Sequence, residues 1–201
     1  AARWAMSGAN GQPWEFVVVK DARLRKKIAE IYSEGRYRTH IIESTRNADL
    51  RHPGADQAPE ELPRFINAPV IIVVCGDPRT MQASVQTNIL LSGDRVFHEN
   101  LANTTQMIQL AASALGLGAG WVSISPPCDG RIMTALGIPD IYRINTIVPI
   151  GYPSKPAPPY RRKLDEIVHQ DKYDMKKFRS DEQVVEFIRF LRKKTRPAYT
   201  V

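Results

Sequence analysis

The stretch AMSGANGQPWEFVVV, Ala5–Val19, decides the fold, because it joins a tight loop directly to a strand. Its segment Ser7–Gly11 ends a helix whose last turns are residues 1–6, since Gly and Asn tolerate the backbone angles that end helices. After Pro13, the β-branched and aromatic run Trp14–Val19 predicts a strand. The chain therefore opens with a loop that leads into a sheet.

The loop also carries groups that suit a flat heteroaromatic ligand. Ser7, Asn10 and nearby backbone amides supply hydrogen-bond donors and acceptors, while small Gly8 and Ala9 permit close approach. Taken alone, the same residues also fit a helix stop followed by an Asn-Gly turn. The choice between these interpretations depends on the rest of the chain.

Hydrophobic periodicity predicts the remaining elements. In chain order these are a helix from Asp21 to about Tyr32, a central strand over Ala68–Gly76, a helix from about Arg95 to Leu115, a strand over Ala119–Ile124, a short helix from Asp129 to Leu136, a strand over Asn145–Gly151, and a helix from about Ser180 to Lys194. Residues 33–62 are polar and irregular, which predicts a surface excursion that could cover a site. Within it, Tyr37, His40 and Arg46 are either substrate contacts or ordinary surface residues.

Length and composition set the class of protein. The 201 residues fit one domain, residues 1–201, and 43% apolar with 24% charged residues is ordinary for a globular chain. No apolar run long enough to span a membrane and no secretory leader are apparent, so we expect a cytoplasmic protein without a membrane partner. Cys75 and Cys128 form no CxxC pair and no metal-ligand spacing, which argues against disulfides and zinc.

The net charge of +7 comes largely from basic residues beyond residue 155. Such a tail can bind nucleic acid, form the wet face of a terminal helix, or hold a phosphate-bearing cofactor. No interleaving of aromatic and basic residues and no helix-turn-helix pattern accompany the charge. We therefore expect no nucleic-acid partner.

Three motifs, in order along the chain, resemble the nitroreductase family. The loop Ala5–Val19 is similar to the family's Pro-Ser, Asn and Gln-Pro-Trp loop, with Met6 where proline is usual. Asn103–Trp121 is similar to its long central helix and following strand, and Val148–Pro153 with Arg161–His169 to its last strand and basic pair. Together they cover the chain from about residue 1 to residue 169.

The resemblance implies an α+β fold, an α/β/α sandwich whose central mixed, mainly antiparallel sheet is flanked by helices. It implies an FMN cofactor held by the following residues: Met6, Ser7, Gly8, Asn10, Asn100, Gly120, Trp121, Val122, Ser123, Arg161, Arg162 and Lys163. The last three are candidates for the flavin phosphate, although adjacent basic residues are more commonly a solvated patch. Trp121 fits a core position equally well.

The implied activity is an oxidoreductase that passes electrons from NADH or NADPH through the flavin to a nitroaromatic or quinone. Since the cofactor performs the chemistry, no catalytic side chain is assigned. The resemblance also implies a homodimer, in which the loop of one subunit reaches the other's flavin and the arm 152–201 embraces the partner. Alternatives are a reductive dehalogenase, a flavin-cleaving enzyme, or a flavin-binding protein without turnover.

One departure from the family concerns the phosphate. Family members normally begin with an Arg-x-Ser-x-Arg-like stretch that grips the phosphate, and this sequence starts after that point. Either this sequence lacks a preceding segment that binds the phosphate, or phosphate binding relies on the region of Arg161.

Overall fold

The computed structural model describes residues 1–51, 62–85, 89, 92–153 and 160–194. Contacts divide the chain into two compact units. The first contains residues 1–36 and 59–155, and the second contains residues 37–58 and 156–199. The single domain expected from the sequence stays a prediction.

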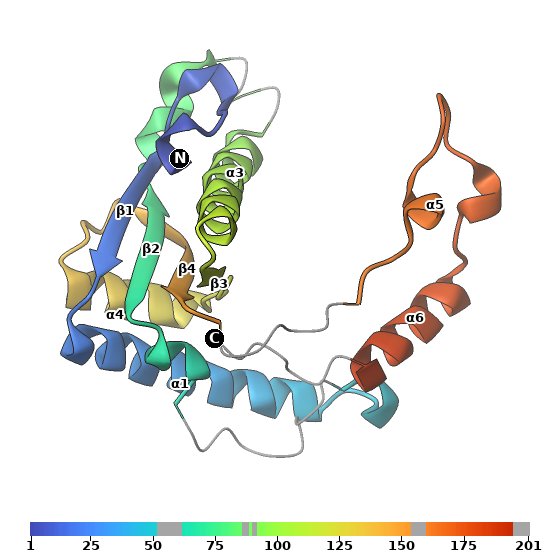
Figure 1. Ribbon diagram of the computed structural model, residues 1–201, viewed down its shortest axis with the longest axis horizontal. Helices are drawn as coiled ribbons and strands as arrows, with labels where there is room; N and C mark the ends of the chain where they lie inside the picture. Colours follow the sequence, from blue (N-terminus) through green and yellow to red (C-terminus); the bar gives the residue numbers. More distant parts are fainter. Residues whose placement is uncertain (52–61, 86–88, 90–91, 154–159, 195–201) are drawn as a thin grey trace. The chain divides into compact units, whose positions relative to one another are not determined.

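A four-stranded sheet forms the centre of the first unit. Its strands are β1 (Trp14–Val19), β2 (Val70–Gly76), β3 (Gly118–Ala119) and β4 (Arg143–Gly151), in the order β1-β2-β4-β3 (Figure 1). All three neighbouring pairs are antiparallel. The buried run after residue 68 thus forms a central strand, as predicted.

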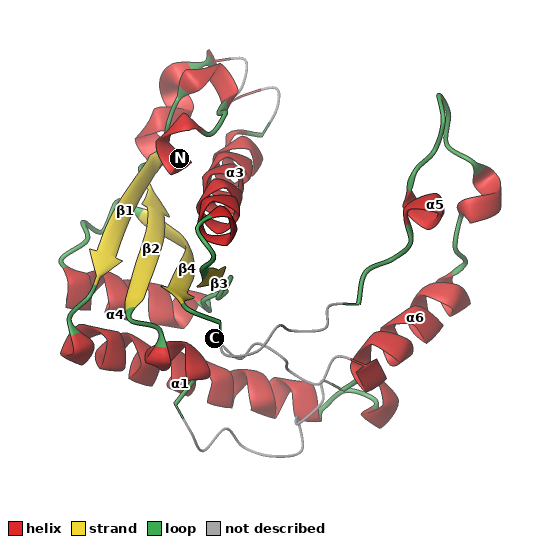
Figure 2. Ribbon diagram, viewed as in Figure 1, coloured by secondary structure: helices red, strands yellow, loops and turns green. Residues whose placement is uncertain are grey.

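Helices cover both faces of this sheet (Figure 2). α1 (Ala22–Ser44) and α4 (Pro126–Leu136) pack on the face that carries Val73, and α3 (Gly93–Ala114) packs on the face that carries Val74. Successive residues of a strand point to opposite faces, so β2 contributes to both cores. The expected α+β sandwich of three layers is confirmed.

Short helices complete the two units. Those of the first unit are η1 (Ala2–Trp4), η2 (Gly8–Asn10), η4 (Arg64–Asn67) and η5 (Pro78–Ala83). Those of the second unit are η3 (Ala48–Leu50), α5 (Leu164–Ile167), η6 (Met175–Lys177) and α6 (Asp181–Lys194). The terminal helix is confirmed, whereas most of the proline-rich segment expected to be extended, residues 154–159, lies outside the described residues.

The prediction that α1 ends near Tyr32 is wrong, because the helix continues to Ser44. Its predicted start is confirmed, since the backbone N–H groups of Arg23 and Leu24 donate to Asp21 Oδ1 at 2.8 and 3.0 Å. The helix passes through Gly35, where a Cβ atom would lie 2.7 Å from Cys128 Sγ. Glycine lets α1 and α4 approach closely, and this packing outweighs its low helix propensity.

The strand predicted over Ala119–Ile124 is also shorter than expected. β3 ends at Ala119, and only an isolated bridge between Val122 and Ile147 continues the pairing. The partner strand carries Pro149, which has no N–H to donate to a ladder. Residues 120–124 therefore flank β4 without forming a regular strand.

Asp129, in the first turn of α4, gives the fold a pH dependence. Burial raises the pKa of its carboxyl from 3.8 to about 6, and Oδ1 has no hydrogen-bond partner among the residues that the structure describes. The folded state therefore holds the proton more tightly, and this contribution to stability is complete below pH 3.8 and is lost as the pH rises through 6.

Asp129→Asn should therefore stabilise the protein at pH 7.5 by about 1 kcal/mol, after allowing for solvent screening and the favourable helix end. The gain should decrease toward zero below pH 3.8, where the carboxyl of the native protein is protonated in the folded state and mostly protonated in the unfolded state. Urea unfolding of both proteins at pH 3.5 and 7.5 measures this difference. An equal difference at the two pH values would contradict the assignment.

Both cysteines are buried, and burial raises the pKa of the Cys75 thiol to about 11. Among the described residues, no cluster of His, Cys, Asp or Glu side chains could hold a metal ion. Within the same residues, no helix combines the length and the apolar character that a membrane crossing requires.

Candidate functional site

The loop before β1 has an unusual backbone conformation. Three non-glycine residues adopt positive φ angles, with values of 51° at Ala9, 53° at Asn10 and 44° at Gln12. Each such residue costs on the order of 1–2 kcal/mol and persists only where the surroundings hold it. A strained loop of this kind marks a candidate functional site.

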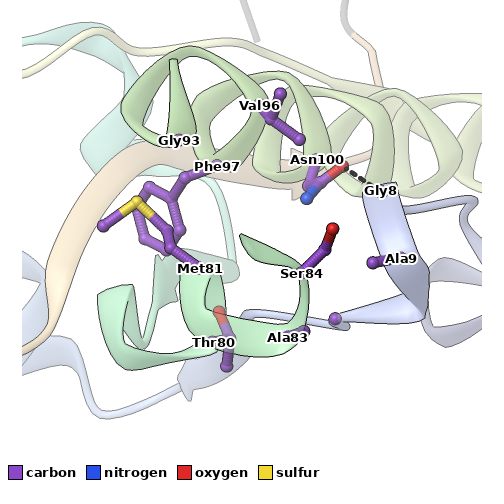
Figure 3. Close-up of a pocket in the computed structure, with 11 residues that line it drawn as sticks. Gly8, Ala9, Thr80, Met81, Ala83, Ser84, Gly93, Val96, Phe97 and Asn100 are labelled. Carbon is purple, nitrogen blue, oxygen red and sulfur yellow. Dashed lines mark hydrogen bonds between the residues drawn. The ribbon is translucent and has the colours of Figure 1, made fainter. Parts of the chain in front are cut away.

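The surroundings that hold the loop belong to α3. Asn100 Oδ1 accepts the backbone N–H of Gly8 at 3.0 Å, and Asn103 Nδ2 donates to the carbonyl oxygen of Met6 at 2.7 Å. One residue further along, the hydroxyl of Thr104 donates to the carbonyl oxygen of Ala2 at 2.9 Å. Figure 3 shows the first of these bonds, with the Asn100 oxygen directed at Gly8.

The loop also closes on itself through Ser7. The Ser7 hydroxyl oxygen accepts the Gln12 N–H at 3.1 Å, and the Ser7 carbonyl accepts the Asn10 N–H at 3.0 Å. The side-chain amide of Asn10 is exposed and has no hydrogen bond in the described part of the chain. Asn10 is therefore the loop residue best placed to bond a ligand through its side chain.

A small pocket is lined by residues of the loop, η5 and α3 (Figure 3). Its volume is about 10 Å³, which is room for about one water molecule and far too little for a flavin. Met81 and Phe97 form one wall, opposite Ala9 and Ser84. This pocket lies beneath the loop as part of its support, so any larger ligand must contact the loop elsewhere.

In residues 120–123, every second backbone amide points toward β4. The N–H groups of Gly120 and Val122 donate to the carbonyls of Pro149 and Ile147 at 3.1 and 2.9 Å. Because amides alternate in direction along an extended chain, those of Trp121 and Ser123 face away from β4. Of the four residues expected near the flavin, these two have backbone donors that β4 does not use, and Trp121 is 42% exposed.

The structure gathers Met6, Ser7, Gly8, Asn10 and Asn100 into one cluster. The remaining first-unit candidates, Gly120 to Ser123, form a second cluster, because the loop leads into β1 and these residues flank β4 at the opposite edge. Three strand spacings, about 14 Å, separate the two edges. One chain thus presents two separate clusters of candidate residues.

The basic candidates belong to the second unit. Arg161 Nη1 donates to the Tyr160 carbonyl at 2.9 Å, and Lys163 is exposed just before α5. Arg162 is half-buried, and its guanidinium donates to the Glu166 carbonyl at 2.9 Å. Their role at a phosphate stays a prediction.

Sequence reasoning did not assign Asn103 and Thr104 to the site. Both lie within one helical turn of Asn100, at i+3 and i+4, which places the three side chains on the same face of α3. That spacing is visible in the sequence. It would have identified these residues had the loop been known to pack on this helix.

Comparisons with known proteins identify the family of the chain. The family model described as the nitroreductase family matches residues 1–152. An Archaeoglobus fulgidus protein, whose name includes NADH dehydrogenase and NAD(P)H nitroreductase, is 28% identical over 155 residues, which are 76% of this chain and 68% of that protein. The chain belongs to the nitroreductase family.

Other relatives carry out different chemistry. Iodotyrosine deiodinase 1 of Mus musculus is 30% identical over 176 residues, which are 84% of this chain and 58% of that protein. A crystal structure of oxidised iodotyrosine deiodinase bound to FMN and 3-iodo-L-tyrosine has a TM-score of 0.63 at 22% identity, covering 86% of this chain and 83% of that one. The fold is thus shared by proteins with different substrates, and the chain spans little more than half of the mouse protein.

Proposed function

We propose that this chain binds FMN and acts as an oxidoreductase that uses NADH or NADPH to reduce a nitroaromatic or quinone. The observation that carries the proposal is the strained loop of residues 6–12, which α3 holds in place by side-chain hydrogen bonds. A conformation this costly is typical of a ligand-binding segment. The FMN bound in the similar deiodinase structure supports a flavin as that ligand.

The residues present fit such a cofactor. The exposed Asn10 amide can bond the polar rim of the flavin ring, and Gly8 leaves space for close approach. The outward amides of Trp121 and Ser123 can donate to ring nitrogens, and the Arg161 region can hold a phosphate. When bound, FMN would supply the electron transfer between NAD(P)H and the acceptor. The chain's part is to orient the ring and to set the polarity around it.

A homodimer is part of the proposal. The two clusters of candidate residues lie toward opposite edges of one sheet, so a second copy would bring the loop of one chain to residues 120–123 of the other. Several large apolar side chains of the first unit are also exposed and favour burial against a partner, namely Trp4, Met6, Leu110, Leu115 and Trp121.

Reductive dehalogenation is the second candidate function. Five of the curated relatives that the chain matches are iodotyrosine deiodinases, at 25–30% identity. By the resemblance, the two functions would share the flavin loop and differ in what covers the substrate. The residues expected to form that cover include the second half of α1, with Tyr37 and His40, whose rings lie 6.3 Å apart.

The visible spectrum of the purified protein tests the flavin proposal. We expect flavin absorption bands that bleach when NADH or NADPH is added without oxygen. A colourless protein that also fails to take up added FMN would contradict the proposal. If the bands bleach, reoxidation by a nitroaromatic, a quinone or 3-iodotyrosine under the same conditions separates the two candidate functions, since only a dehalogenase would release iodide.

A further inference from the structure

The second unit contains a pocket of about 320 Å³ around α5, η6 and the first turn of α6. Apart from Arg162, none of its lining residues is assigned to the flavin. Its volume is at the lower end of the range of about 300–1,000 Å³ for small-molecule sites. The pocket therefore suits a ligand of the size of a mononucleotide.

The wall of this pocket is fixed by its own side chains. The His169 and Tyr173 rings stack with their centres 4.2 Å apart and their planes 22° from parallel. The backbone N–H of Asp174 donates to His169 Nδ1 at 3.0 Å, and Lys177 Nζ donates to the Val168 carbonyl at 2.6 Å. Residues 168–177 thus form a closed loop. These contacts hold the wall of the pocket in place without a ligand.

The charges that line the pocket are mainly positive. Lys177 and Arg179 are half-buried, and neither pairs with a carboxylate within the residues that the structure describes. Arg162 is paired, with Nε 3.5 Å from Glu166 Oε2. Because His169 Nδ1 accepts an N–H, a neutral ring carries its proton on Nε2 and can donate there. These donors and the surplus charge suit a phosphate.

The same pocket offers aromatic surface. Tyr173 and Phe178 are 56% and 61% exposed. Exposed rings beside cations form a platform on which the flat face of a base can stack. We propose that this pocket binds a nucleoside monophosphate, with the phosphate at Lys177 and Arg179 and the base against Tyr173 and Phe178.

Calorimetric titration of the FMN-saturated homodimer with AMP tests this proposal, and it can be run equally on protein that takes up no FMN. We expect one AMP per chain. Phe178→Ala should weaken AMP about tenfold, the usual effect of losing one stacked ring. Arg179→Gln should also weaken it, by removing a phosphate donor. The matched controls Met175→Ala and Lys172→Gln change exposed residues of the same loop outside the pocket and should leave binding unchanged.

Adenosine and inorganic phosphate, titrated separately, test the two halves of the ligand. Both should bind more weakly than AMP. The proposal is overturned if phosphate binds as tightly as AMP, if Phe178→Ala binds like the native protein, or if AMP binds only after FMN has been removed. The last result would make the pocket part of the flavin phosphate site. Since bound flavin is read from its absorption in each sample, failure of this proposal is distinguishable from failure of the flavin proposal.

Discussion

Replacing Asn100 with alanine is expected to weaken FMN binding by about 10- to 100-fold. The substitution leaves the partly buried N–H of Gly8 without its acceptor, at a cost of about 1–3 kcal/mol. The loop at Ala9, Asn10 and Gln12 then loses a contact that offsets its backbone strain. Titrating the FMN-free protein with FMN, followed by quenching of flavin fluorescence, measures the change.

The control for this prediction is Gln106→Ala, an exposed position on the same helix. It should bind FMN as the native protein does. Asn103→Ala should have a smaller effect than Asn100→Ala, because its bond to the Met6 carbonyl is exposed and water can replace it. Native affinity in the Asn100 variant, with its fold intact by circular dichroism, would show that the loop does not depend on α3.

Phe97→Ala is expected to lower the free energy of unfolding by about 3–5 kcal/mol. The ring is 1% exposed and packs with Trp14, Val74 and Leu101 in the core between α3 and the sheet. The ring is tightly packed on the side of the sheet, since a Cβ at Gly76 would lie 2.9 Å from it. Globular proteins are stable by only about 5–15 kcal/mol, so the loss is a large fraction.

Urea unfolding at one fixed protein concentration measures this loss, because the stability of the proposed homodimer would depend on concentration. Glu99→Ala, which removes an exposed partner of Arg95 on the same helix, should change the free energy of unfolding by less than about 0.5 kcal/mol. A cost for Phe97→Ala below about 1.5 kcal/mol would mean that the core relaxes around the cavity, contrary to the tight packing seen here.

Much of the fold could be predicted because its signals are local. The central strand is a continuous apolar run between Pro69 and Gly76, and α4 ends at Gly137, whose φ of 67° is the left-handed conformation that stops helices. The second half of α1 could not be predicted, because Gly35 is favourable there only through contact with Cys128. Such a contact joins residues far apart in the sequence, which a local pattern does not encode.

The candidate site divides in the same way. The loop was recognisable from its glycines and Asn10, whereas its strain at Ala9 and its support by Asn103 depend on the docked α3. The early end of β3 could not be predicted from its own residues either. It follows from Pro149, which lies on a strand about thirty residues later in the chain. Features that depend on a distant partner arise only in the folded chain.

The strand order has a consequence for the time course of folding. β2 pairs on one side with β1 and on the other side with β4. Residue 70 must therefore meet residue 150 before β2 and β4, the two central strands, can pair. Contacts between residues so far apart in sequence close large loops and slow the search for the native state. During synthesis, the β2 edge that β4 will cover stays unpaired until Gly151 has left the ribosome. During that time the unpaired apolar run Val70–Cys75 is the segment most prone to pair with a wrong strand. A chaperone that covers this segment would therefore give the nascent chain the most protection.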